Sequence, residues 1–314
     1  MKHNSKIFVA GGQSGLVGTA IVRNLQSRGY KNIITKKREN LDLLNPIQVS
    51  SFFKNIKPEY VFLAAAKVGG IWANNTQKAD FIFNNLQIQN NVIYNAWKYK
   101  VKKLLFLGSS CIYPKHAKQP IKESAFMTGP LEETNDAYAI AKIAGIKMCQ
   151  SFNEQYKTNF ISVIPTNLYG PNDNFNLQTS HVIPALIRKL HEAKVGNKQV
   201  VVLWGSGKVY REFMYVDDAA KAFVFLMKRY NDSTIINVGT GINLTIKQLA
   251  EIIKISVGYQ GKIQWDTTKP DGIPKKQLDV SKLFAFGWHP KTSLVQGIKK
   301  EYEWYLKTKL LNLI

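Results

Sequence analysis

The sequence has few cysteines and no long apolar run, and these absences exclude several classes of protein. Its 314 residues contain two cysteines, Cys111 and Cys149, too few for a disulfide framework. The five histidines and two cysteines show none of the spacings typical of metal ligands, so we expect no metal. The apolar run at residues 7–10 is too short for a signal sequence or a membrane span. We therefore expect a soluble cytoplasmic protein that does not contact a membrane.

Acidic residues are also scarce, with 21 Asp and Glu against 43 Lys and Arg, so the formal net charge is +22. Such an excess attracts anions, and nucleic acid or a phosphate-rich small molecule would both fit. The basic residues are spread along the chain, however, and no motif of a helix-turn-helix, zinc finger or RNA-binding domain is present. We interpret the charge as solvated surface and do not expect nucleic acid as a partner.

Apolar runs alternate with amphipathic stretches through the first half of the chain. We expect strands, buried on both faces, at residues 6–10, 32–36, 60–66, 103–109 and 160–166. We expect helices at residues 15–28, 46–55, 79–99 and 137–156. This alternation predicts an α/β fold of the Rossmann type, a doubly wound parallel sheet that binds ligands at the carboxyl ends of its strands.

After Gly170 the pattern is less regular. We expect a loop at 172–180, helices at 182–193, 217–229 and 245–257, strands at 200–204 and 235–238, a polar turn before 217, and a tail of turns and short helices. The pattern predicts a Rossmann domain over residues 1–170 and a smaller mixed α/β lobe for the substrate over residues 171–314. The two interleave, because part of 205–240 is expected to join the first sheet.

A glycine-rich turn, Gly11 to Gly18, follows the first predicted strand. Gly12, Gly15 and Gly18 are three residues apart at the start of an amphipathic stretch. Glycine allows a tight turn and a close approach of pyrophosphate, and the following helix offers free N–H groups. The pattern predicts a dinucleotide site, and a purely structural turn is the alternative.

The residues after the second predicted strand bear on the choice of cofactor. An acidic residue there would bind the ribose 2′-hydroxyl of NAD, and a basic residue the 2′-phosphate of NADP. The chain has Lys36, Lys37, Arg38 and Glu39. The planar guanidinium of Arg38 suits a phosphate, so we predict NADPH/NADP⁺, although Glu39 and the general excess of lysine weaken this inference.

A serine-bearing strand end and a Tyr–Lys pair predict a reductase site. Ser109 and Ser110 end the fourth strand, and Tyr138 and Lys142 are four apart, on one face of a predicted helix that Thr134 or Asn135 can cap. A nearby ammonium favours the phenolate, so Tyr138 can exchange a proton with a substrate oxygen while hydride moves at carbon. Either serine can hydrogen-bond that oxygen. A chance Tyr–Lys pair on an exposed helix is the alternative.

These residues belong to a longer resemblance, from residue 6 to about residue 306. The chain resembles the GDP-L-fucose synthases, a family of the extended short-chain dehydrogenase/reductase superfamily. The matching stretches are residues 64–71, 104–114, 138–147, 165–171, 180–186 and 269–272. The resemblance implies an oxidoreductase that is also an isomerase. It would invert C3 and C5 of GDP-4-keto-6-deoxy-D-mannose and reduce C4 with NADPH to form GDP-L-fucose. It also implies a homodimer formed by the helices at 79–99 and 137–156.

The resemblance also implies individual catalytic roles. Ser109, Tyr138 and Lys142 match the reducing residues, Cys111 matches the base of the epimerisation and His181 matches its acid. A thiol and an imidazole, with ordinary pKa values near 8.5 and 6.5, suit proton transfer near neutral pH. Taken alone, a cysteine after a strand is usually core, and His181 could simply cap the next helix. Cys149 is interpreted as structural.

Further matching positions are assigned to ligands. The cofactor positions are Gly12, Ser14, Gly15, Leu16, Val17, Gly18, Arg38, Ala65, Lys142, Pro165, Asn167, Leu168 and His181. The sugar-nucleotide positions are Lys189, Trp204, Arg211 and Asp271. Simple core packing of Trp204 and a salt bridge of Arg211 are the alternatives.

The chain departs from the family pattern at three of these places. Ser14 and Lys189 each stand where an arginine is usual, and Gln13 also differs. Lys189 keeps the positive charge but lacks the planar guanidinium that can bind a phosphate through two N–H groups. Another nucleotide-sugar epimerase, reductase or dehydratase of the superfamily is the alternative function. Dehydratases place an acidic pair where this chain has Ser110 and Cys111. A non-catalytic NADP sensor would not need the Ser–Tyr–Lys set.

Overall fold

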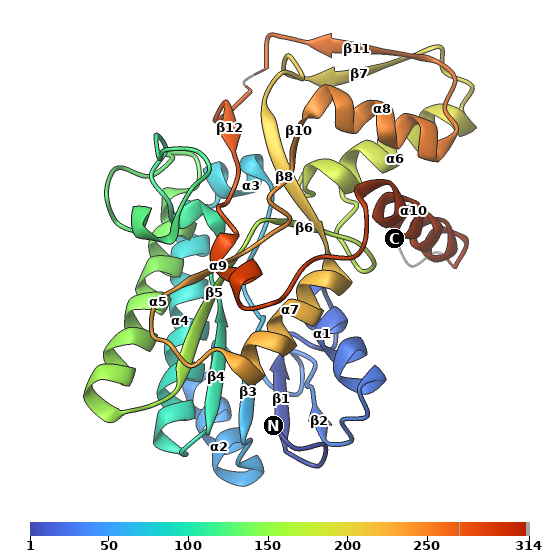
Figure 1. Ribbon diagram of the computed structural model, residues 1–314. Coiled ribbons are helices and arrows are strands. Elements are labelled where there is room, and N and C mark those ends of the chain that lie inside the picture. Colours follow the sequence, from blue (N-terminus) through green and yellow to red (C-terminus); the bar gives the residue numbers. More distant parts are fainter. Residues whose placement is uncertain (270, 312–314) are drawn as a thin grey trace.

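A six-stranded parallel sheet forms the first lobe of the molecule (Figure 1). Its strand order is β2-β1-β3-β4-β5-β9, and every neighbouring pair is parallel. The strands are β1 (Ile7–Ala10), β2 (Ile33–Ile34), β3 (Tyr60–Leu63), β4 (Lys103–Leu107), β5 (Phe160–Pro165) and β9 (Ile236–Val238). This computed structural model describes residues 1–269 and 271–311; Pro270, in the matching stretch 269–272, lies outside the described residues. The predicted fold class is confirmed.

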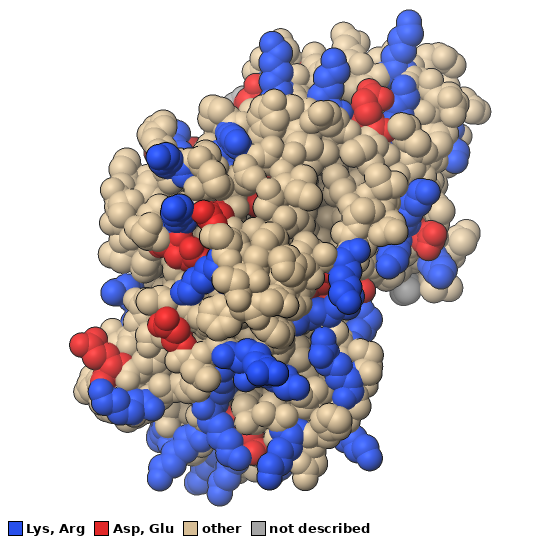
Figure 2. Space-filling model, viewed as in Figure 1, with Lys and Arg blue, Asp and Glu red and all other residues tan. Residues whose placement is uncertain are grey.

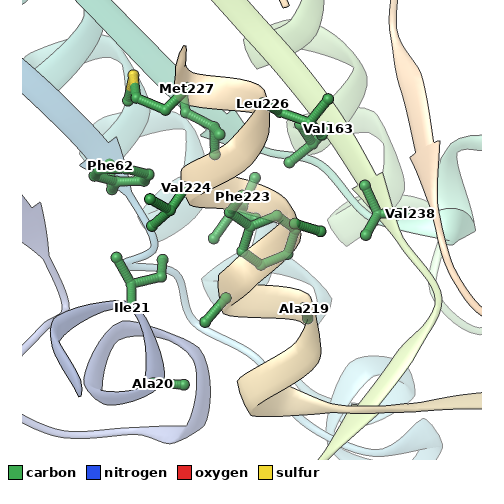
Figure 3. Packing of buried hydrophobic residues seen from close by; sticks show 14 of the residues in the cluster. Ala20, Ile21, Phe62, Val163, Ala219, Phe223, Val224, Leu226, Met227 and Val238 are labelled. Atoms are coloured by element: carbon green, nitrogen blue, oxygen red, sulfur yellow. The ribbon is translucent and has the colours of Figure 1, made fainter. Parts of the chain in front are cut away.

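Helices cover both faces of this sheet. They are α1 (Leu16–Ser27) and α7 (Val216–Arg229) on one face, and α2 (Pro46–Ile56), α4 (Lys78–Lys98) and α5 (Asp136–Tyr156) on the other. Ile7 and Val9 belong to the core on the first face, and Phe8 belongs to the core on the second. Because successive side chains of a strand point to opposite faces, a strand covered on both sides is apolar throughout. Figure 3 shows Phe223 of α7 in the first core.

A second lobe lies beyond the carboxyl ends of the sheet strands (Figure 1). Its strands are β6 (Asn167–Tyr169), β7 (Val200–Trp204), β8 (Tyr210–Tyr215), β10 (Asn243–Thr245), β11 (Lys262–Asp266) and β12 (Lys275–Lys276). Its main helices are α6 (Val182–Val195), α8 (Ile246–Val257) and α10 (Leu294–Leu310), which share a third apolar core. Shorter helices are α3 (Ile71–Thr76), α9 (Ser281–Ala285), η1 (Ser110–Ile112) and η2 (Glu123–Ala125). Strand β9 and helix α7 return to the first lobe, whereas the boundary at residue 170 stays a prediction.

Three local predictions were wrong. The expected polar turn before residue 217 contains β8, which pairs with β6, β10 and β12. The tail expected to hold only short helices contains the 17-residue α10, which begins with a capping box of Ser293 and Gln296. The second strand, expected at 32–36, is only two residues long and pairs with β1 alone. For β8, pairing with strands distant in sequence decided the outcome.

The predicted cap of α5 was also wrong in its contacts. Asn135 occupies the N-cap position, but its side chain makes no capping hydrogen bond. The carboxylate of Asp136 instead accepts a bond from the backbone N–H of Ala137 at 2.7 Å. Cys149, further along the same helix, is fully buried in the core between α5 and the sheet.

Charge is distributed over both lobes. On the face shown in Figure 2, lysine and arginine side chains lie over the first and the second lobe. No helix in the described part of the chain is long and apolar enough to cross a membrane. Within residues 1–269 and 271–311, no group of three or more His, Cys, Asp or Glu side chains is placed to hold a metal ion.

Candidate active site

The turn between β1 and α1 forms an open cradle at a helix N-terminus. Gly15 is the N-cap of α1, with φ of +83°, and open space lies where its side chain would be. The first turn of α1 has no capping side chain and no acidic residue. Its N–H groups and the positive end of its dipole therefore remain available to an anion. These features fit the pyrophosphate of a dinucleotide.

Gly18 and Ala65 shape the same cradle from behind. A Cβ on Gly18 would collide with the carbonyl of Gly11, so only glycine lets α1 approach the turn this closely. The backbone of Ala65, just after β3, lies beside Gly11. Gly12 is buried between β1 and α1, and Leu16 and Val17 are partly buried against the first core.

Arg38 lies in the segment that follows β2. Its side chain is 77% exposed, and its Nε is 3.7 Å from the Asp42 carboxylate. Glu39 pairs with Lys37 at 3.5 Å. Ser14 is exposed, and the side chain of Gln13 bonds the Thr35 hydroxyl, which ties the loop to the residue after β2. Glu39 thus pairs with a neighbouring lysine, and Arg38 is exposed beside the Asp42 carboxylate.

Ser109 and Tyr138 face each other at the carboxyl end of β4. The Ser109 hydroxyl accepts a bond from the backbone N–H of Cys111 at 3.4 Å and is partly exposed, whereas Ser110 is buried. Burial raises the pKa of the Tyr138 phenol, the charge of Cys111 raises it further, and the Ser109 hydroxyl partly offsets this. The geometry therefore favours Ser109 over Ser110, and it keeps the phenol protonated.

Lys142 lies one helical turn after Tyr138 and is almost fully buried. Its Nζ donates to the carbonyl of Leu107 at 2.8 Å and lies 5.7 Å from the centre of the Tyr138 ring. Burial lowers the pKa of Lys142 to about 8, and the charge of Cys111 acts in the opposite direction. The end of β4 therefore holds this ammonium beside the phenol.

Cys111 is buried in the same site. Burial raises the pKa of its thiol, while Lys276, Ser109 and Lys142 all lower it, Lys276 most of all. Cys111 and Lys276 also line one small cavity. Lys276 of β12 was not predicted from the sequence, because it comes from a short strand far along the chain and is one of many lysines.

His181 stands at the start of α6, two residues after Thr179. It is the N-cap residue of α6 but makes no side-chain capping bond, so the interpretation as a simple cap is wrong. The preceding Thr179 carbonyl accepts a bond from the backbone N–H of Gly70 at 2.9 Å. The imidazole is exposed, yet the protein around it displaces enough water to lower its pKa.

Phe81 of α4 lies between Gly69 and Tyr138 of α5. Its ring lies against Gly69, next to Gly70, and packs edge-on against the Tyr138 ring at 6.1 Å. The structure thus places Ser109, Cys111, Tyr138 and Lys142 together. The segment before His181 is linked to them indirectly, through the Thr179–Gly70 hydrogen bond and the contact of Gly69 with Phe81.

The end of β5 and strand β6 contribute the remaining predicted cofactor positions. Pro165 ends β5, and Asn167 and Leu168 begin β6 directly afterwards. The Asn167 side chain donates to the backbone carbonyl of Glu212 at 2.8 Å, and Leu168 packs against the first core. All three lie at the edge of the sheet that carries the glycine turn.

The predicted sugar-nucleotide residues lie in the second lobe. Trp204 is 63% exposed, so the interpretation as simple core is wrong. The ammonium groups of Lys189 and Lys269 lie 5.4 and 5.7 Å from the centre of its ring. An exposed indole between two cations suits a nucleotide, because the base can stack on the ring and the phosphates can pair with the ammonium groups. Lys269 was not predicted.

Arg211 and Asp271 lie nearby. Arg211 donates to the backbone carbonyls of Tyr210 and Ile273 at 2.8 and 2.6 Å. Within the described residues it has no carboxylate at ion-pair distance, so the predicted alternative of a salt bridge is not observed. Asp271 accepts bonds from the N–H and hydroxyl of Ser206 at 2.7 and 2.6 Å.

Comparison with known proteins places this arrangement in a family. The model of the NAD dependent epimerase/dehydratase family matches residues 7–239. The chain belongs to this family. It is 58% identical over 304 residues to GDP-L-fucose synthase 1 of Arabidopsis thaliana, covering 97% of this chain and 94% of that protein. It is 50% identical over 313 residues to GDP-L-fucose synthase of Escherichia coli strain K12, covering 97% of each.

A solved structure agrees. The GDP-mannoheptose C4 reductase MlghC from Campylobacter jejuni, with NADP bound, superposes with a TM-score of 0.90 at 44% identity, over 98% of this chain and 99% of that one. Membership of the epimerase/dehydratase family confirms the predicted superfamily and the predicted class of enzyme.

Proposed function

We propose that this chain inverts C3 and C5 of GDP-4-keto-6-deoxy-D-mannose and then reduces C4, forming GDP-L-fucose. The names and identities of the Arabidopsis and Escherichia coli relatives support this reaction. NADPH is the cofactor, in agreement with the NADP-bound neighbour and the cradle at α1.

One observation carries the proposal: Cys111 lies in the same buried site as Ser109, Tyr138 and Lys142. A reductase needs only the last three, which serve a substrate oxygen. A thiol with a neighbouring ammonium, Lys276, adds a group suited to removing protons from carbon.

The inversion depends on the acidity of protons beside a ketone. In this scheme the Cys111 thiolate removes a proton next to C4, and His181 returns one on the opposite face. Lys276 and Lys142 favour the thiolate, which burial alone would disfavour. Proton transfer by a positioned group typically contributes about 10²–10⁴-fold in rate.

The reduction uses the other side of the site. NADPH, when bound, supplies the hydride for C4. Tyr138 donates its proton to the C4 oxygen, and the Ser109 hydroxyl holds that oxygen in place. Lys142 lies where it can electrostatically stabilise the phenolate that Tyr138 leaves behind. The remaining cofactor positions predicted from the sequence, from Gly12 to Leu168, are proposed to hold the dinucleotide between α1 and β6.

The GDP part is proposed to bind in the second lobe. Trp204 offers a flat apolar surface, Lys189 and Arg211 offer charges for the diphosphate, and Asp271 offers a carboxylate acceptor. A homodimer and a cytoplasmic location also stay proposals. The outward faces of α4 and α5 support the dimer, because they expose Phe83 and Ile140.

Product analysis tests the function. Incubation with GDP-4-keto-6-deoxy-D-mannose and NADPH should consume NADPH and yield GDP-L-fucose by NMR. Cys111→Ala should reduce the ketone without inverting C3 and C5, whereas Cys149→Ala should behave as wild type. Normal inversion by Cys111→Ala would refute the assignment of the base.

A C4 reductase without epimerase activity is the second candidate, supported by the 44% identity to the Campylobacter jejuni GDP-mannoheptose reductase. Wild-type protein in deuterated water distinguishes the two. An epimerase incorporates deuterium at C3 and C5 before NADPH is added, and a simple reductase does not.

A further inference from the structure

Two carboxyl groups outside the active site have buried oxygens that lack hydrogen-bond partners. Glu301 of α10 is fully buried, and neither of its carboxylate oxygens makes a well-formed hydrogen bond. The backbone N–H of Gly170 is the one donor that lowers its pKa. Asp173, between β6 and α6, has one oxygen on the backbone N–H of Asn174 at 2.7 Å and the other buried without a partner. Three buried acceptor oxygens without a well-formed hydrogen bond are costly unless a proton or a cation lies among them.

The pair joins α10 to the segment that leads to His181. Phe175, two residues after Asp173, packs against Trp304 and Tyr305 with ring centres 6.0 and 4.7 Å apart. Glu301, Trp304 and Tyr305 are three and four residues apart, so they share one face of α10. This face of the helix holds the segment through both aromatic and carboxyl groups.

Hydrogen bonds make the segment a compact unit. The N–H of Asp173 donates to the carbonyl of Gly170 at 3.1 Å, and the Asn174 side chain donates to the Thr179 hydroxyl at 2.8 Å. The Thr179 carbonyl in turn accepts from Gly70. A displacement of Asp173 would therefore be passed on to residues 179–181.

The charged groups around the pair do not neutralise it. Tyr169 of β6 and Tyr215 of β8 face Glu301, and their pKa values are raised partly by its charge. Asp218 and Asp217 of α7 are engaged by Lys221 at 2.9 Å and by Arg23 of α1 at 2.6 Å. Lys300, on α10 itself, lies 5.4 Å from the centre of the Tyr215 ring. Among the described residues, no basic group reaches ion-pair distance of either carboxylate.

We propose that Asp173 and Glu301 share one proton, and that this carboxyl–carboxylate bond makes them positioning residues for His181. With one proton, an O–H group of one acid donates to the other and joins α10 to the segment. With none, two buried charges repel each other and the contact loosens. The effect on His181 rests on the proposed function, whereas the effect on folding does not.

The direction of the pH dependence follows from burial. Desolvation raises the pKa of Asp173 to about 7, and desolvation together with the charge of Asp173 raises the pKa of Glu301 well above its usual value. A carboxyl whose pKa is higher in the folded chain stabilises the fold at low pH and loses that contribution as pH rises through the folded value. The contribution should be complete below about pH 4 and decline through about pH 7.

Thermal unfolding across this pH range tests the proposal. Glu301→Gln supplies an amide donor that does not titrate, so its Tm should fall less than that of wild type between mildly acidic and mildly alkaline pH, by about 2–4 °C. Glu303→Gln, an exposed position on the same helix, should follow wild type. Asp173→Asn should behave like Glu301→Gln. It provides the same test if Glu301→Gln does not fold. Parallel curves for wild type and both variants at the pair would overturn the proposal.

Two further measurements test the effect on His181 and distinguish a shared proton from a bound cation. In wild type, the rate of deuterium exchange at C3 and C5 should fall at alkaline pH more than it does in Glu301→Gln; equal profiles would overturn the positioning role. At alkaline pH and constant ionic strength, replacing tetramethylammonium by K⁺ or Mg²⁺ should leave wild-type Tm unchanged. A rise absent from Glu301→Gln would show a cation between the carboxylates instead of a proton.

Discussion

At the scale of single residues, burial decides which groups in the site hold protons. Tyr138 and Cys111 both lie in low-dielectric surroundings that raise their pKa values, and Lys142 in surroundings that lower its pKa to about 8. Such opposed shifts are typical of sites where a phenol must give up a proton only when the substrate oxygen develops charge.

Replacing Tyr138 by Phe should therefore separate the two reactions. We expect NADPH oxidation to fall by about 10²–10⁴-fold, because the proton donor for the C4 oxygen is lost. Deuterium exchange at C3 and C5, measured by NMR, should persist, since it depends on Cys111. Equal losses in both assays would assign Tyr138 to both steps.

Lys276 permits a test of how the thiol is activated. Lys276→Met removes the cation that lowers the pKa of Cys111 most, so that pKa should rise. The pH profile of deuterium exchange should then shift toward alkaline pH by about one unit. Lys122→Met removes an exposed positive charge elsewhere and provides the control. An unshifted profile would mean that Lys276 does not act on the thiol.

At the scale of elements, the turn between β1 and α1 shows how closely a helix must approach a strand. The Cα of Gly18 lies against the backbone of Gly11 and Gly12, where no side chain fits. Because backbone atoms cannot move aside as a side-chain tip can, the whole helix would have to shift.

Gly18→Ala should consequently impair both folding and cofactor binding. We expect a loss of about 1–3 kcal/mol in the free energy of unfolding, measured with urea, and weaker NADPH binding by fluorescence titration. Gly29→Ala is the matched control: Gly29 has φ of +78° after α1, so alanine should cost about 1 kcal/mol there and leave NADPH affinity unchanged. Unaltered affinity in Gly18→Ala would contradict the assigned role of the turn.

At the scale of the whole molecule, the outer faces of α4 and α5 remain uncovered in the single chain. Phe83 is 63% exposed and Ile140 46% exposed, and the two helices pack side by side over the sheet. Two copies could bury these apolar side chains by pairing the helices across a twofold axis.

Sedimentation velocity tests this arrangement. Wild-type protein should sediment as a dimer, and Phe83→Asp should sediment as a monomer at the same concentration. Ile255→Asp, at an even more exposed apolar position on α8, should remain dimeric. A monomeric wild type would rule out the dimer.

The sequence alone determined those features that depend on local spacing. The glycine turn, the apolar strands of the first lobe and the pair Tyr138–Lys142 are each set by residues within a few positions of one another, so their periodicity and composition were sufficient. The departures at Ser14 and Lys189 were equally visible without a structure.

Tertiary structure decided the features that depend on residues distant along the chain. Strand β8 forms because three other strands pair with it, Ser109 is distinguished from Ser110 by its exposure toward Tyr138, and Lys276 reaches Cys111 from β12. The buried pair Asp173 and Glu301 likewise exists only because α10 packs on the segment before α6. A local pattern cannot encode these contacts, because each depends on the distance and shielding between groups that folding alone brings together.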